Sequence, residues 1–253
     1  MKKFIFALLV FVFISAGFIQ PKLTVSVAVA ANVQFAMAPL KTQFEKETGI
    51  KVNVTISSSG KFTAQIEQGA PYDVFVSADV SYPLELYKKK LTVDIPKVYA
   101  EGMLVLWTQR NDIKPSIKGL SAKEIKKIAI ANPKLAPYGV AAEETLKYYK
   151  LYDEVKNKLV FGESIAQTNQ YITSMAADIG FTAKSVVLSN ELKGKGSWID
   201  IDKKAYSPIA QAAVILKHGK ETNAIASQKF YNYLYSNNAK AILKEYGYIV
   251  NEQ

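Results

Sequence analysis

The sequence of 253 residues contains no cysteine, a single histidine, His218, and a single arginine, Arg110. The lack of cysteine excludes thiol catalysis, disulfide bonds and thiolate metal sites. Because His218 lies beside Gly219 and Lys220 in a polar turn, we expect it to be a solvated surface residue. No histidine then remains for a serine–histidine pair or a metal site, and we do not expect an enzyme.

The chain is strongly basic, but lysine carries almost all of the positive charge. The net charge is +10 and the pI is about 9.4. Base recognition and bidentate phosphate contacts favour arginine over lysine, so we expect no nucleic-acid partner. A basic electrostatic field also attracts small anions and raises their rate of encounter. The composition therefore favours a small anion as the ligand.

The N-terminus has the pattern of a secretory signal peptide, which we assign to residues 1–20. Lys2 and Lys3 precede an apolar block, and the small residues Ser15, Ala16 and Gly17 lie near its end. The alternative is a membrane anchor, but the block has only about 15 residues, fewer than the roughly 20 that a span needs. We therefore expect secretion to the periplasm.

The hydrophobic pattern alternates strands with helices, which predicts an α/β fold with helices on both faces of parallel sheets. We expect the first helix to begin near Pro39, because proline disrupts a helix interior, and we interpret 96–102 as a turn. Hydrophobic residues make up 49% of the sequence, enough for two domains. The predicted strands are 23–31, 51–56, 73–77, 103–108, 127–131, 158–161, 178–182 and 209–216, and the predicted helices are 39–49, 61–68, 82–89, 139–149, 164–174, 222–236 and 238–246.

Small polar residues follow three of the predicted strands, at Asn32, Ser57–Gly60 and Ser77–Ala78. Ligands bind at the carboxyl ends of strands in open α/β sheets. The N-terminus of a helix also offers free N–H groups and partial positive charge to an anion. Serines before a helix can simply cap it, but three such loops at one edge predict a binding site. A P-loop is not supported, because Thr55 and Phe62 replace residues that its pattern requires.

These loops also carry a resemblance to a known family, the periplasmic molybdate-binding proteins of ABC transporters. The resemblance implies a type II periplasmic-binding-protein fold with two lobes, each a mostly parallel sheet flanked by helices. The lobes would comprise residues 22–101 with 207–253, and residues 102–206. The matching segments are Ala30-Ala31-Asn32, Ser57-Ser58-Ser59-Gly60, Gln65 to Pro71, Asp73 to Asp79, Ala131-Asn132-Pro133, Pro137-Tyr138-Gly139, Ile165 to Thr168 and Asp178 to Phe181.

The resemblance implies an oxyanion site between the lobes, without direct ligation of the metal and without a cofactor. Ala78 and Ile165 would donate through backbone N–H groups, and Tyr138 through its phenol or its N–H. Ala183 occupies a position at which some members use a tyrosine ligand. The implied set of oxyanion contacts is Asn32, Ser59, Ala78, Tyr138 and Ile165.

The expected ligand is molybdate, with tungstate binding in the same way, and the expected partner is an ABC permease that receives the ligand from a monomeric protein. A deprotonated tetrahedral dianion needs only donors, whereas monohydrogen phosphate also needs an acceptor. We expect Asp79 to point away from the site as a structural cap and Lys61 to be solvated. The alternatives are another oxyanion, such as sulfate or an oxidised chlorine species, and an anion-sensing module that docks on a receptor.

Overall fold

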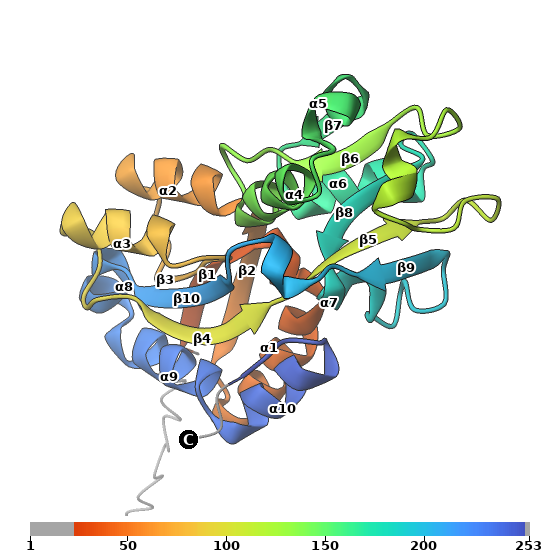
Figure 1. Ribbon diagram of the computed structural model, residues 1–253. Helices are drawn as coiled ribbons and strands as arrows, with labels where there is room; N and C mark the ends of the chain where they lie inside the picture. Colours follow the sequence, from red (N-terminus) through yellow and green to blue (C-terminus); the bar gives the residue numbers. More distant parts are fainter. Residues whose placement is uncertain (1–22, 251–253) are drawn as a thin grey trace, which may run out of the picture.

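The computed structural model describes residues 23–250, so the predicted signal peptide, residues 1–20, lies outside the described residues. The described chain forms two five-stranded sheets that lie side by side, each with helices packed against it (Figure 1). We call the sheet that contains the first strand, with its helices, lobe 1, and the other sheet with its helices lobe 2. This two-lobed α/β architecture is the predicted one.

Lobe 1 has the strand order β2-β1-β3-β10-β4, in which only β10 runs opposite to its neighbours. Lobe 2 repeats this arrangement in the order β7-β6-β8-β5-β9, with β5 reversed. The strands are β1 (Thr24–Ala30), β2 (Lys51–Ser57), β3 (Val74–Val76), β4 (Lys97–Gly102), β5 (Leu104–Thr108), β6 (Ile128–Ala131), β7 (Leu159–Gly162), β8 (Ile179–Ala183), β9 (Ser197–Asp200) and β10 (Ile209–Ile215). Each sheet is therefore mostly parallel.

Helices cover both faces of the first sheet, so strand β1 is buried on both sides. Val25, Val27 and Val29 face α1, α9 and α10, whereas Ala28 faces α2 and α3 (Figure 1). In lobe 2, α4 and α6 pack against β6 and β8. The helices are α1 (Gln34–Thr48), α2 (Ser59–Glu67), α3 (Ser81–Lys88), α4 (Pro137–Tyr148), α5 (Tyr152–Val155), α6 (Ile165–Thr173), α7 (Lys184–Val187), α8 (Lys217–Thr222), α9 (Ala224–Leu234) and α10 (Asn237–Glu245), with a 3-10 turn η1 (Ala31–Val33) before α1.

The chain passes between the lobes twice. It leaves lobe 1 at Gly102, where β4 ends, and enters lobe 2 at Leu104, where β5 begins. It returns between β9 and β10, and β4 and β10 are neighbouring strands in lobe 1. The two connections therefore lie side by side, which is the arrangement needed for one lobe to rotate against the other.

Two local expectations from the sequence are wrong, and one strand was not predicted. Helix α1 begins at Gln34 and contains Pro39, so the helix does not start at the proline. Ala36 and Met37 are buried in the lobe 1 core, and this burial offsets the hydrogen bond that proline removes. The predicted turn at 96–102 is strand β4, which gains its order by pairing with β10. Strand β9 was missed altogether, since four residues give little pattern.

His218 is partly exposed to solvent, in line with the prediction from its neighbours in the sequence, but it also has a structural partner that the sequence did not indicate. Its side chain is 39% exposed, and its Nδ1 lies 3.0 Å from Oδ1 of Asp73, which is fully buried. The same carboxylate accepts hydrogen bonds from the Ser26 N–H and from Asn223 Nδ2. His218, on α8, thus helps to satisfy the buried carboxylate of Asp73, the residue that precedes β3.

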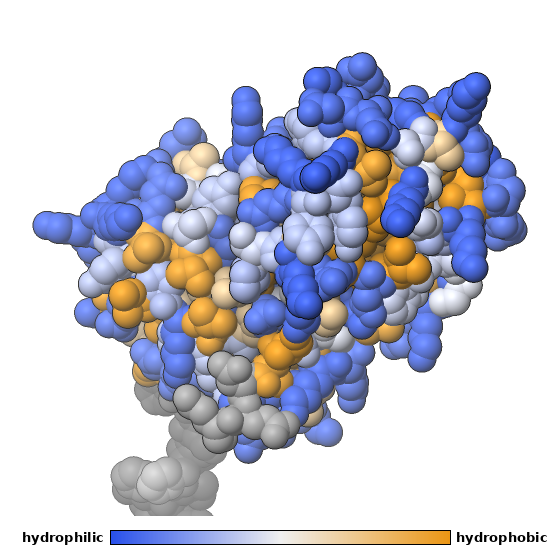
Figure 2. All heavy atoms as spheres, viewed as in Figure 1, coloured by the Kyte–Doolittle hydropathy of each residue, from blue (hydrophilic) through white to orange (hydrophobic). Residues whose placement is uncertain are grey.

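The surface shown in Figure 2 is mainly hydrophilic, with apolar residues gathered in several separate patches. Within residues 23–250, no helix combines the length and the apolar character that crossing a membrane requires.

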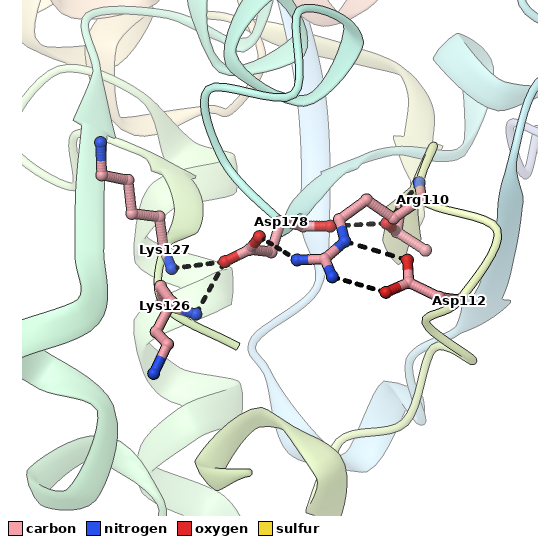
Figure 3. A network of polar contacts seen from close by, with 6 residues as sticks. Arg110, Asp112, Lys126, Lys127 and Asp178 are labelled. Carbon is pink, nitrogen blue, oxygen red and sulfur yellow. Dashed lines mark hydrogen bonds and ion pairs between the residues drawn. The ribbon is translucent and has the colours of Figure 1, made fainter. Parts of the chain in front are cut away.

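Asp178 is the centre of a polar network that holds the start of β8 in lobe 2 (Figure 3). Its carboxylate accepts from the N–H groups of Lys126 and Lys127 at 2.7 and 2.9 Å and pairs with the guanidinium of Arg110. Arg110 also contacts Asp112, whose side chain is 68% exposed. Burial alone would raise the pKa of Asp178, but these hydrogen bonds and the positive charge lower it overall.

We predict that Asp178→Asn lowers the free energy of unfolding at pH 7 by about 1.5–3 kcal/mol, the range for hydrogen bonds to a charged group. Because the folded-state pKa of Asp178 lies below the unfolded value of about 3.9, the wild-type contribution is present above that value and is lost as pH falls through the folded-state pKa. Urea unfolding from pH 7 to pH 2.5 measures both effects. Asp112→Asn is the matched control, since the Asp112 side chain is exposed and an exposed ion pair contributes little to stability. Equal losses of stability in the two variants would contradict this role of Asp178.

Candidate functional site

The five residues predicted to contact an oxyanion line one small pocket between the lobes. Its cavity volume is only about 10 Å³, far below the roughly 300–1,000 Å³ of pockets for drug-sized molecules. The predicted residues are all at most 3% exposed. The pocket is lined by Ala30, Ala31, Asn32, Ser58, Ser59, Ala78, Ala136, Pro137, Tyr138 and Ile165. Its size suits a small ion rather than an organic solute.

Three helices begin at this pocket: α2 from lobe 1, and α4 and α6 from lobe 2. Ser59 and Ile165 are the first residues of α2 and α6, and Tyr138 is the second residue of α4. The backbone N–H groups of these three residues donate to no partner within residues 23–250. Such N–H groups carry the positive end of the helix dipole. The pocket is therefore a cradle for negative charge.

The capping residues leave these first N–H groups free. Ser58 Oγ accepts from the Lys61 N–H in α2, and Ser164 Oγ accepts from the Gln167 N–H in α6. In both helices the serine satisfies the third residue, so the first residue keeps its N–H for the pocket. Of the two neighbouring serines, Ser58 caps α2 and Ser59 lines the pocket.

The hydroxyl of Ser59 is held by its neighbours in lobe 1. Its Oγ accepts from the Ala78 N–H at 3.0 Å and lies 3.1 Å from Ser77 Oγ. The Ala78 N–H is therefore engaged by Ser59. Asp79 accepts from the Tyr82 N–H in the first turn of α3 and from Ser81 Oγ, in keeping with its predicted role at the start of that helix. Burial raises the pKa of Asp79 above its ordinary value.

Asn32 lines the pocket, but each of its N–H groups donates elsewhere. Its backbone N–H donates to the Gly162 carbonyl at 2.7 Å. Its Nδ2 donates to Gln211 Oε1 at 2.9 Å and to Tyr248 Oη at 3.4 Å. In this arrangement Asn32 forms a wall of the pocket, and donation to an anion would require one of these bonds to be exchanged.

The phenol of Tyr138, like the side chain of Asn32, is hydrogen-bonded to Gln211. Its Oη accepts from Gln211 Nε2 at 3.2 Å, and burial raises the pKa of the phenol well above its ordinary value. The phenol accepts in this bond, and its own hydrogen is donated in no hydrogen bond of the described residues. The N–H of Tyr138 also has no partner among them, so both donors that the sequence left open are available.

No aspartate, glutamate, lysine, arginine or histidine lines the pocket. Among the described residues there is also no cluster of three or more histidine, cysteine, aspartate or glutamate side chains that could hold a metal ion. The chemistry offered here is therefore hydrogen-bond donation by neutral groups. Ala183, at the position where a tyrosine ligand occurs in some family members, is fully buried in the lobe 2 core.

Two backbone hydrogen bonds join the lobes beside the pocket. The Gly60 N–H donates to the Leu135 carbonyl at 2.9 Å, and the Asn32 N–H donates to that of Gly162 at 2.7 Å. Lys61 pairs with Glu163 across the same cleft, so it is not simply solvated as predicted. Tyr82 Oη donates to the Lys134 carbonyl at 3.1 Å. These contacts hold the two halves of the pocket together.

The sequence matches the family described as bacterial extracellular solute-binding protein over residues 25–249. The chain belongs to this family. It is 40% identical over 227 residues to the molybdate-binding protein ModA of Azotobacter vinelandii, covering 88% of this chain and 89% of that protein. It is 37% identical over 224 residues to the protein of the same name from Rhodobacter capsulatus, covering 88% and 86%.

A solved structure of the solute-binding family supports the same relationship. The periplasmic molybdate-binding protein of Azotobacter vinelandii superposes with a TM-score of 0.85 at 33% identity, over 90% of this chain and 100% of that one. A match over nearly the whole chain confirms the type II architecture with two lobes.

Sequence reasoning missed the residues of this solute-binding cleft that lie behind the pocket. Leu135, Gly162 and Gln211 contribute through carbonyls or a buried amide, and nothing in their spacing indicates it. Gly60 carried a signal, since glycine allows close approach of two backbones. A Cβ at this position would lie 2.9 Å from Tyr82 Oη and 3.1 Å from the Leu135 carbonyl oxygen.

We predict that Gly60→Ala weakens ligand binding about tenfold while the protein stays folded, because the methyl group forces the lobes apart; overpacking of this kind costs about 1–3 kcal/mol. Isothermal titration with molybdate and small-angle scattering, which reports the fraction of closed molecules, measure the effect. Gly119→Ala is the control, because its Cβ would make only an ordinary contact of 3.5 Å with Ser116. Unchanged affinity in Gly60→Ala would show that this approach does not limit closure.

Proposed function

We propose that this chain is an extracytoplasmic solute-binding protein that captures molybdate between its lobes and delivers it to an ABC permease. The observation that carries the proposal is the convergence of three helix N-termini on one pocket without a charged side chain. The names of the relatives, molybdate-binding proteins at 40% and 37% identity, support the choice of ligand. We propose tungstate as a second ligand, since it presents the same tetrahedral dianion.

In this proposal Ser59 donates both its hydroxyl and its N–H, and Tyr138 and Ile165 donate their N–H groups. The Ala78 N–H and Ser77 Oγ both donate to the Ser59 oxygen, so the Ser59 hydrogen is free to point at the anion. Asn32 closes the pocket. Monohydrogen phosphate is disfavoured because no carboxylate accepts its proton. We propose no catalytic activity and no cofactor, a monomeric protein, and a periplasmic location that follows from the predicted signal peptide.

Sulfate remains the second candidate ligand, because its charge and shape are those of molybdate and only its size differs. In so small a pocket, selection between the two anions depends on how closely the lobes approach. An anion-sensing module that docks on a receptor would use the same pocket, so pull-down with the permease distinguishes it from a transport protein.

Thermal unfolding with each oxyanion tests the ligand. Molybdate and tungstate at about a thousand times their dissociation constants should add roughly 4 kcal/mol to the free energy of unfolding, whereas sulfate and phosphate at the same concentration should add much less. Equal stabilisation by sulfate would contradict the proposed selectivity. The absence of a shift with all four anions would contradict the oxyanion site itself.

Ser59→Ala should weaken molybdate binding by about 1–3 kcal/mol, the cost of leaving a buried charged group short of one donor. Calorimetric titration measures this loss. Ser236→Ala is the matched control, because Ser236 caps α10 in lobe 1 by accepting from the Ala239 N–H. The control should lose about 1 kcal/mol of stability and no affinity. If both variants bound molybdate as the wild type does, Ser59 would not be a ligand.

A further inference from the structure

Gln211 lies at the centre of a buried polar cluster behind the pocket. Its side chain is fully buried on β10. Oε1 accepts from Tyr99 Oη at 2.7 Å and from Asn32 Nδ2 at 2.9 Å, and Nε2 donates to Tyr138 Oη at 3.2 Å. One amide therefore contacts a pocket residue of lobe 1, a pocket residue of lobe 2 and both strands that connect the lobes.

A bulge between β4 and β10 places Gln211 in this position. Gln211 pairs with Ala100 and the next residue, Ala212, pairs with Val98, so Tyr99 is the extra residue on β4. A bulge bends the strand and redirects its side chains. The Tyr99 hydroxyl consequently meets the amide of Gln211 across the ladder.

The hydrogen bond that Tyr248 donates determines the direction of the other hydrogen bonds in the cluster. Tyr248 Oη donates to the carbonyl of Asn32 at 2.8 Å, and burial raises the pKa of this phenol to about 12, so it keeps its proton. Its oxygen can then only accept from Asn32, which turns Nδ2 of Asn32 toward Tyr248 and Gln211. The amide of Gln211 must in turn present oxygen to Asn32 and nitrogen to Tyr138.

The side-chain amide of Gln211 is tightly packed against Gly102, where the chain passes from lobe 1 to lobe 2. A Cβ on Gly102, the last residue of β4, would overlap both Tyr138 Oη and Gln211 Nε2. The phenol of Tyr138 is therefore held in one place by the Gly102 backbone on one side and by Gln211 on the other. Because this phenol anchors the first turn of α4, its position also sets the position of the Tyr138 N–H.

We propose that Gln211 is a positioning residue for anion selection: it fixes Asn32 and Tyr138 relative to each other and so sets the width of the closed pocket. The inference rests on the proposed function, since it concerns the size of the bound oxyanion. Gln211 does not line the pocket; it acts through the two residues that do. Molybdate and sulfate differ in size and share their charge, so their affinity ratio reports the width of the pocket.

Titration of molybdate and of sulfate into three variants tests this role. Gln211→Met keeps the length of the side chain and removes all three hydrogen bonds. Tyr138→Phe removes the contacts of the phenol with Gln211 Nε2 and with the Asn32 side chain and keeps the Tyr138 N–H. Tyr99→Phe is the control, because it removes the 2.7 Å hydrogen bond to the same amide without touching a pocket residue. Circular dichroism of each variant establishes that it is folded.

We expect Gln211→Met and Tyr138→Phe to narrow the molybdate-to-sulfate affinity ratio at least fivefold, and Tyr99→Phe to leave it within twofold of the wild type. An unchanged ratio in the first two variants overturns the proposal, even if both affinities fall together, since such a fall shows a structural role only. If Gln211→Met does not fold, Tyr138→Phe alone decides. Wild-type protein that binds neither anion would contradict the proposed function, whereas wild-type binding with unaltered variants contradicts only the role of Gln211.

Discussion

The arrangement of the two lobes follows from one requirement: backbone N–H donors from both lobes must meet at a single point between them. A buried anion must receive hydrogen bonds in place of water, and here the donors are the first N–H groups of α2, α4 and α6. One of these helices belongs to lobe 1 and two belong to lobe 2, so neither lobe can surround an anion alone. Other features support this arrangement. Gly60 lets the two backbones approach each other at the cleft, and the neighbouring strands β4 and β10 lead into the two connections between the lobes. Ser58 and Ser164 satisfy the third N–H of their helices and leave the first for the pocket.

The sequence predicts the elements and the pocket because both follow from short-range patterns. Alternating valines predict β1, and serines after a strand predict a helix start with free donors. Tertiary contacts override such patterns elsewhere: Pro39 lies within α1 because its neighbours are buried, and β4 forms because β10 lies beside it. Resemblance to the family supplied the pairing of Ser59 with Tyr138 and Ile165, which are far apart in the sequence.

The direction of hydrogen bonds is the part that sequence could not supply. Asn32 reads as a donor to the ligand, yet its amide hydrogens go to Gln211 and Tyr248. The sequence leaves open a phenol or an N–H donor at Tyr138, and only the structure shows that the phenol oxygen accepts a hydrogen bond from Gln211. Gln211 itself lies in an apolar stretch of β10, where a glutamine has no local pattern to identify it. Buried polar clusters of this kind specify one arrangement because each member fixes the next.

Two hydrogen bonds between backbone groups join the lobes beside the pocket, from Gly60 to Leu135 and from Asn32 to Gly162. Hydrogen bonds between neutral peptide groups respond little to dissolved salt, whereas attraction between a chain of net charge +10 and a dianion is screened by it. The ion pair of Lys61 and Glu163 is exposed and adds little. Ionic strength should therefore slow the arrival of the anion and leave its rate of escape almost constant. At high ionic strength, the association rate of the ligand would therefore fall, while the lifetime of the bound state would stay the same.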